Sequence, residues 1–164
     1  MNMIHFPQRR VVFVSNGGIC RAPMAAGVLR RLLQESGHTQ SIEVVSAAIS
    51  DAHIGSLPDP LAIVAAADRG YDIRDVRVRK VEPRDFNATA MLAVDAVVLA
   101  SLRGLAPHGL GDRPRLLGRY ARLAISSIVD PYGGAIGDYQ LALDLIEASC
   151  KRLVAPLLSG PSSC

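Results

Sequence analysis

The sequence contains few aromatic residues and few cysteines. Aromatic side chains make up 4% of its 164 residues, and tryptophan is absent. No basic stretch is interleaved with aromatic residues on which bases could stack, so we do not expect a nucleic acid partner. The three cysteines are too few, and odd in number, for the disulfide framework of a secreted fold. We therefore expect a reducing, cytoplasmic environment.

Long apolar runs and a large excess of charge are absent as well. No segment approaches the roughly 20 apolar residues of a membrane span, and the run at residues 11–14 is too short for a signal-peptide core. The net charge is only +3, while 49% of the residues are hydrophobic and 20% are charged. This composition is typical of one folded globular domain, and we expect no direct membrane insertion.

Apolar, β-branched segments alternate with helical patterns, which predicts a parallel sheet with helices on both faces. The expected strands are residues 10–14, 42–46, 95–100 and 115–117. The expected helices before the last one are residues 23–33 and 60–69, the latter ending at Gly70. The last helix is indicated by an apolar stripe at Tyr139, Leu143, Ile146, Cys150, Leu153 and Leu157. Within it we expect Cys150 to be a small buried residue.

Residues 11–23 read VVFVSNGGICRAP, which indicates a strand, a glycine-containing loop and the start of a helix. Gly17 and Gly18 permit backbone conformations that turn several N–H groups inward, next to the positive end of the helix dipole. Arg21 adds a planar fork that can bind two phosphate oxygens at once. The candidate phosphate-binding residues are Asn16, Gly17, Gly18, Ile19, Cys20 and Arg21. Local sequence alone leaves an ordinary strand-to-helix turn equally open.

A second candidate segment is SIVDPYGG at residues 127–134. Pro131 keeps Asp130 outside a helix. The Asp130 carboxylic acid could then give a proton to a leaving oxygen, with Tyr132 and His53 as walls for an aromatic substrate. The alternatives are a plain turn for this segment and a loop-bracing role for His53.

Together these segments resemble the signatures of the low-molecular-weight protein tyrosine phosphatases. That family has a strand followed by Cys-x-x-x-x-x-Arg-Ser-Pro and a distal Asp-Pro-Tyr, which here read VSNGGICRAP and VDPYGG. The resemblance continues through PMAAGVLRRLL, IEVVSAAISDAHIGSLPDPLAI and DLIEASCKRLV. It implies a three-layer α/β sandwich with a central four-stranded parallel sheet at residues 10–158. Residues 1–9 would form an N-terminal extension and residues 159–164 a flexible tail.

The resemblance also implies roles for individual residues. In the family the loop cysteine attacks phosphorus as a thiolate and forms a phosphocysteine, the arginine clamps the transferring group, and the aspartate protonates the leaving phenol. In this sequence the nucleophile position is Ser15, the clamp is Arg21 and the acid is Asp130. No metal or cofactor is implied. The implied partner is phosphate or a phosphotyrosyl protein, and a bacterial tyrosine kinase system is one candidate source.

Serine at position 15 changes the expected chemistry. A thiol has a pKa of about 8.5, which a phosphate-binding loop can lower until the thiol ionises. A serine hydroxyl is a far weaker acid and needs an adjacent general base, which the loop residues do not offer. If thiolate chemistry supplies on the order of 10⁴-fold in rate, its loss amounts to roughly 5 kcal/mol. Binding would survive, because the backbone donors and Arg21 are unchanged.

Ser15 is accompanied by other departures from the family pattern. These are Gly18 at a usual Asn, Ala22 at a usual Ser, Ser101 at the usual Asp after the third strand, Ala52 at an aromatic wall position and Gly133 at a second tyrosine. Several of them would remove partners of a thiolate, so we interpret the set as drift after a loss of catalysis. Cys20 directly precedes Arg21, and we expect it to be buried behind the loop rather than to attack phosphorus.

Three hypotheses of function remain at this stage. We favour a phosphate- or phosphotyrosine-binding protein that is catalytically impaired by Ser15. The second is an active tyrosine phosphatase whose nucleophile was engineered to Ser15. The third is a purely structural interaction module without a working pocket.

Overall fold

The computed structural model describes residues 9–122 and 126–160, which form a central sheet of four parallel strands in the order β2-β1-β3-β4. The strands are β1 (Arg9–Ser15), β2 (Ile42–Ala48), β3 (Ala90–Ala93) and β4 (Pro114–Leu116). The α-helices are α1 (Arg21–Glu35), α2 (Pro60–Asp68), α3 (Ala96–Leu105) and α4 (Ile136–Ser159), and the 3-10 helices are η1 (Pro83–Asn87) and η2 (Leu117–Ala121). The predicted fold class is confirmed. Except for Arg9, Ser159 and Gly160, the expected extension and tail lie outside the described residues.

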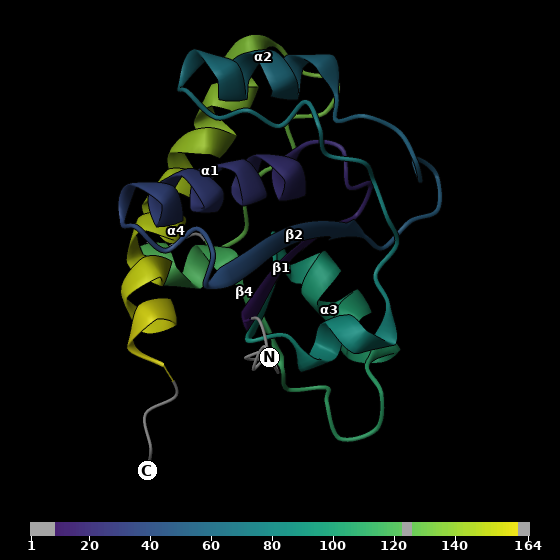
Figure 1. Ribbon diagram of the computed structural model, residues 1–164. Helices are drawn as coiled ribbons and strands as arrows, with labels where there is room; N and C mark the ends of the chain where they lie inside the picture. The colour runs from purple at the N-terminus through teal and green to yellow at the C-terminus, as the bar shows by residue number, and fades with distance from the viewer. Residues whose placement is uncertain (1–8, 123–125, 161–164) are drawn as a thin grey trace, which may run out of the picture.

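Strand β1 lies inside the sheet and sends alternate side chains to its two faces. Val11 and Phe13 belong to a core shared with α1, α2 and α4, whereas Val12 and Val14 belong to a second core shared with α3. Figure 1 shows α1 and α4 on one side of the sheet and α3 on the other. Because both faces of β1 are covered, its sequence is a continuous apolar run without polar alternation.

One predicted strand is wrong. Residues 95–100 form the start of helix α3, and the third strand is β3, a few residues earlier. Their β-branched composition favours a strand, but the Asp95 carboxylate accepts a hydrogen bond from the Val98 N–H (2.7 Å) and caps the helix. Val98 and Leu102, four residues apart, are buried, while Val97 between them is 76% exposed. This burial follows the helical period and not the strand period.

The apolar stripe predicted for the last helix is confirmed, since all six of its side chains are buried along α4. Cys150 packs against α1, with its Sγ 3.9 Å from the Ala25 carbonyl oxygen. It therefore acts as a small apolar core residue. Neither α4 nor any other helix in the described part of the chain is long and apolar enough to cross a membrane.

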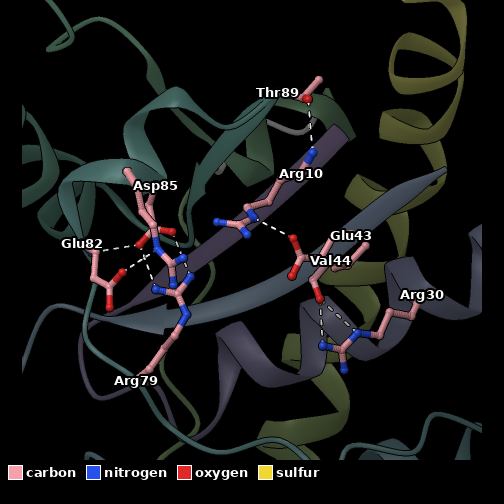
Figure 2. A network of polar contacts seen from close by, with 9 residues as sticks. Arg10, Arg30, Glu43, Val44, Arg79, Glu82, Asp85 and Thr89 are labelled. Carbon is pink, nitrogen blue, oxygen red and sulfur yellow. Dashed lines mark hydrogen bonds and ion pairs between the residues drawn. The ribbon is translucent and has the colours of Figure 1, made fainter. Parts of the chain in front are cut away.

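Ion pairs join two strands of the sheet and hold together the segment that leads into β3 (Figure 2). Arg10 of β1 binds Glu43 of β2, with 2.7 Å between Nε and Oε2. Arg79 donates to both carboxylate oxygens of Asp85, at 2.8 and 2.9 Å. One of these oxygens also accepts the Glu82 N–H at 2.8 Å. Asp85 is fully buried, and it fixes the turn at η1 that leads into β3.

We predict that Asp85→Ala lowers the free energy of unfolding by roughly 3 kcal/mol, because the partly buried Arg79 guanidinium and the Glu82 N–H both lose their acceptor. Burial alone would raise the pKa of Asp85, but the hydrogen bonds from Arg79 and Glu82 and the Arg79 charge outweigh it and lower the pKa. A lowered pKa in the folded state gives stability that is present above the unfolded value of about 3.9 and is lost as the pH falls through the folded value.

Urea unfolding at neutral pH and through the acid range measures both effects. We expect the variant to be less stable at neutral pH and to lose less stability on acidification than the parent chain. An unchanged acid dependence in Asp85→Ala would contradict this assignment.

Candidate phosphate site

The carboxyl end of β1 opens into a cavity of about 200 Å³. Three segments that are distant in sequence line it: the loop after β1, the segment after β2 and the loop before α4. The lining residues are Ser15, Asn16, Gly17, Gly18, Ile19, Cys20, Arg21, His53, Asp130 and Tyr132. The fold thus brings together all ten candidate site residues at the edge of a parallel sheet where ligands commonly bind.

The loop between β1 and α1 folds around the Ser15 side chain. Ser15 is 2% exposed, and its Oγ accepts a hydrogen bond from the Gly18 N–H at 3.1 Å. Gly18 has a φ of +73°, in the left-handed region that favours glycine. Helix α1 begins at Arg21, so its first N–H groups and its positive dipole end adjoin the loop. This combination of backbone donors and dipole suits a bound phosphate.

Arg21 is buried in the first turn of α1 and held by acceptors from two other segments. Its Nη1 donates to Asp95 Oδ2 at 2.6 Å and to the Ile128 carbonyl oxygen at 2.8 Å. Its Nη2 lies 3.4 Å from Asp130 Oδ2. The two acceptors on Nη1 fix the plane of the guanidinium, whose other N–H groups can serve an anion in the cavity.

Asp95 is the site residue that the sequence analysis missed. Its Oδ1 caps α3 at Val98, while its Oδ2 binds Arg21, so one carboxylate links the end of β3, α3 and the phosphate loop. The wrong strand at residues 95–100 concealed this role, because an aspartate inside a strand has no helix to cap. An Asp between a short apolar strand and a helical pattern is the signal that could have identified it.

The loop before α4 places the candidate acid at the mouth of the cavity. The Asp130 side chain is 54% exposed, and its Oδ1 accepts the Tyr132 N–H at 3.2 Å. The rings of His53 and Tyr132 are tilted by 58°, with centroids 6.5 Å apart. His53 also lies against Gly17, since a Cβ at Gly17 would be 3.4 Å from its Cδ2. The two rings form an aromatic rim beside the Asp130 carboxylate.

Comparison with known proteins identifies the family. The family model described as low molecular weight phosphotyrosine protein phosphatase matches residues 10–160. The chain belongs to the low molecular weight phosphotyrosine protein phosphatase family. The low molecular weight protein-tyrosine-phosphatase of Streptomyces coelicolor is 33% identical over 151 residues, which are 89% of this chain and 92% of the relative. The Schizosaccharomyces pombe phosphatase is 31% identical over 144 residues, 85% of this chain and 92% of the relative.

Solved structures share the fold. YfkJ from Bacillus subtilis superposes with a TM-score of 0.88 at 27% identity, covering 96% of this chain and 99% of that protein. A protein tyrosine phosphatase from Entamoeba histolytica reaches a TM-score of 0.88 at 24% identity, covering 93% of this chain and 99% of that protein. The α/β sandwich with its four-stranded parallel sheet is therefore the fold of the phosphatase family.

Ser101 is not a departure from the family pattern, contrary to the expectation from sequence. The third strand ends at Ala93, so the family Asp that follows this strand corresponds to Asp95. Ser101 lies in the middle of α3. The misplaced third strand caused the error, because it shifted the expected Asp position along the chain. One of the departures taken to indicate lost catalysis is thereby removed.

Gly18 differs from the family Asn, and its surroundings leave no room for a side chain. A Cβ at Gly18 would lie 2.8 Å from Ala48 Cβ and 3.0 Å from Val78 Cγ1. An asparagine there would force these neighbours to move. Ala22, at the usual Ser, is fully buried and offers no hydroxyl. The packing of Ala48 and Val78 therefore fits a glycine at position 18 and not a larger residue.

Cys20 is buried, as expected, although it also lines the cavity beside Arg21. Burial raises the pKa of the Cys20 thiol to about 12, and the Asp59 and Asp130 carboxylates add to the shift. At neutral pH the group is a protonated thiol, which is not an effective nucleophile. Neither Cys20 nor any other described residue belongs to a cluster of His, Cys, Asp and Glu that could hold a metal ion.

We predict that Asp95→Ser raises the Kd for vanadate about tenfold, because serine keeps the α3 cap but loses the ion pair with Arg21. Asp95→Ala should show the same loss of affinity and, in addition, lose about 1 kcal/mol of stability with the cap. Calorimetric titration and thermal unfolding measure the two effects. Asp138→Ser, in the first turn of α4 and outside the cavity, is the matched control. Unchanged affinity in Asp95→Ser would show that Arg21 is held without Asp95.

Proposed function

We propose that this chain binds phosphate or a phosphotyrosyl protein through the loop at residues 15–21, with little or no turnover. The observation that supports this proposal is the position of Arg21. It is a buried cation, held by Asp95 and the Ile128 carbonyl oxygen beside a cavity of about 200 Å³. A bound phosphate would receive charge-assisted hydrogen bonds from a guanidinium that is already fixed in place. We place this function in a reducing cytoplasm, the compartment expected from the small and odd number of cysteines in the sequence.

Ser15 occupies the position from which the family cysteine attacks phosphorus. Among the described residues its Oγ has one hydrogen-bond partner, the Gly18 N–H, which donates to it. No histidine or carboxylate in the described chain hydrogen-bonds to this hydroxyl, so no general base is positioned to take its proton. Without a general base, a serine at neutral pH attacks far more slowly than a thiolate. Catalysis is therefore impaired while the groups that bind phosphate remain.

One solved structure of the same fold supports an aromatic phosphate as the ligand, and a second supports a phosphoryl group beside a serine at the nucleophile position. Wzb from Vibrio vulnificus, 23% identical, is in complex with benzylphosphonate, which combines an aromatic ring with a phosphonate. A cysteine-to-serine mutant of the YwlE arginine phosphatase, 22% identical, has a phosphorylated active-site serine. For this chain we propose an aromatic phosphate, with His53 and Tyr132 beside the ring. A phosphotyrosyl protein of a bacterial tyrosine kinase system is one source of such a group.

We predict that the chain binds vanadate and phosphate but does not steadily hydrolyse p-nitrophenyl phosphate. Arg21→Ala should raise the Kd at least about 100-fold, because it removes two or more charge-assisted hydrogen bonds. Arg31→Ala, an exposed arginine on the same helix, should leave the Kd unchanged. Calorimetry measures binding, and absorbance of released nitrophenol measures turnover. Steady hydrolysis that Arg21→Ala abolishes would overturn the proposal.

A second candidate function is an active protein tyrosine phosphatase whose nucleophile was engineered to Ser15. The retention of Arg21 and Asp130 beside the cavity, with Arg21 held by Asp95, favours this alternative, since these are the clamp and the acid that the resemblance implies. The packing around Gly18 favours natural divergence instead, because a single engineered change would not have altered a neighbouring family position. We therefore keep the impaired binding protein as the main proposal.

The Ser15→Cys variant separates the two functions. We expect it to gain measurable hydrolysis of p-nitrophenyl phosphate, and Ser15→Cys with Ala22→Ser to be about tenfold faster, because a hydroxyl that hydrogen-bonds the thiolate stabilises it. Adding Cys20→Ser should leave this activity in place, since the Cys20 thiol does not ionise near neutral pH. Maximal activity from Ser15→Cys alone, with no gain from Ala22→Ser, would favour the engineered enzyme.

A further inference from the structure

A second and larger hollow is formed by β4, η2 and the C-terminal part of α4. Its volume is about 620 Å³, against about 200 Å³ for the phosphate cavity. Five of its lining side chains are cationic, and we call it the basic groove: Arg115, Arg119, Arg122, Lys151 and Arg152. Tyr120, Ala155 and Pro156 add an aromatic ring and apolar surface. None of its described lining residues is acidic.

The basic groove is separate from the phosphate loop. The two cavities share no lining residue. Helix α4 begins just after the Asp130 loop, and its Tyr139 lies beside Cys20. Arg152 is thirteen residues further along the helix, which corresponds to about 20 Å of helix axis. In Figure 1 this C-terminal half of α4 (yellow) extends to the end of the molecule away from α2.

The cations of the basic groove have no ion-pair partners among the described residues. All fifteen Asp and Glu residues of the chain lie within the described ranges, and none comes within ion-pair distance of the five cations. Asp112 meets Arg115 only through its carbonyl oxygen. The positive charge of this groove is therefore not neutralised by any Asp or Glu side chain of the described residues.

Another arginine-rich part of the chain shows the opposite pattern. The cations between residues 69 and 84 include several with carboxylate partners: Arg69 with Asp144 and Glu147, Arg74 with Asp72, Arg79 with Asp85, Lys80 with Asp51 and Arg84 with Glu82. On a protein surface whose charges serve only solubility, positive and negative side chains are usually interspersed in this way. The unbalanced groove thus differs from the ordinary charged surface of the same protein.

The backbone at Arg122 gives a second, independent observation. Arg122 ends η2 with a φ of 55°, and it is the one described residue other than glycine with a positive φ. A glycine would adopt this conformation without strain, and seven glycines of the described chain do have a positive φ. Instead the position carries an arginine whose side chain lines the groove. A strained backbone position of this kind is often associated with a binding site.

We propose that the basic groove is a second anion site, which binds a small ligand carrying several linked phosphate groups. The planar guanidinium group of arginine can hydrogen-bond to two phosphate oxygens at once. A single phosphate could not form ion pairs with all four arginines and the lysine. The volume is in the range of small-molecule sites and is several times larger than one phosphate requires. Close spacing of like charges costs energy in the empty groove, and a polyphosphate removes that cost on binding.

The test is calorimetric titration of the full chain with inorganic tripolyphosphate, carried out in the Arg21→Ala background so that the phosphate loop does not contribute. We expect saturable binding that weakens as salt is raised. Arg119→Glu with Arg152→Glu should raise the Kd more than about tenfold, since each removes a charge-assisted contact. Arg103→Glu with Arg77→Glu, exposed arginines outside the groove, makes the same change in net charge and should alter the Kd no more than about twofold.

Four outcomes would overturn this site: no binding of tripolyphosphate, an equal loss in the Arg103 and Arg77 control, equally tight binding of citrate, or tighter binding of poly-glutamate. The last would assign the groove to an acidic protein segment. Thermal unfolding checks that each variant is folded. If the glutamate pair unfolds, Arg119→Gln with Arg152→Gln replaces it, and the same loss of affinity is expected. Because Arg21 is absent throughout, the result does not depend on whether the phosphate loop binds.

Discussion

The ion pair between Arg21 and Asp95 is the interaction on which the candidate site depends. It joins the first turn of α1 to the residue that caps α3, two helices on opposite faces of the sheet. The Ile128 carbonyl oxygen adds a third segment, the one that leads to Asp130. One guanidinium thus fixes the relative positions of the loop, the helix cap and the candidate acid. Since Arg21 is buried, removing an acceptor would leave a charge with poor solvation.

This fixed frame surrounds a residue with little reactivity of its own. Ser15 is buried at the base of the cavity, with its oxygen occupied by the Gly18 N–H and no base beside it. The one thiol nearby, Cys20, is held protonated by burial and by two carboxylates. The electrostatics that suit a bound phosphate are therefore present, while an ionised nucleophile is not. The proposal of binding with little turnover rests on this difference, because binding and catalysis would depend on different groups.

The distribution of charge over the rest of the molecule is uneven. Several arginines between residues 69 and 84 bind carboxylates, as Arg79 binds Asp85 in Figure 2. The cations of the basic groove are not balanced in this way. Helix α4 extends from the phosphate cavity to the basic groove, since its first turns lie near the cavity and its last turns line the groove. The small net charge of +3 conceals the uneven distribution of charge, because it sums over the whole chain.

The sequence by itself determined the alternation of strands and helices that predicts a parallel sheet, and the buried stripe of α4, because these follow from local periodicity and turn chemistry. It also supplied the loop at residues 15–21 and the Asp130 segment as candidates, but that these lie at one cavity was expected only from the resemblance to the family. It misassigned residues 95–100, since a β-branched run reads as a strand until the cap at Asp95 is seen. Only the tertiary structure decided that Asp95 holds Arg21, that Ala48 and Val78 fill the space at Gly18, and that residues 115–122 meet residues 151–156 in one groove. Each of these is a contact between distant segments, and no local pattern in the chain encodes which segments will touch.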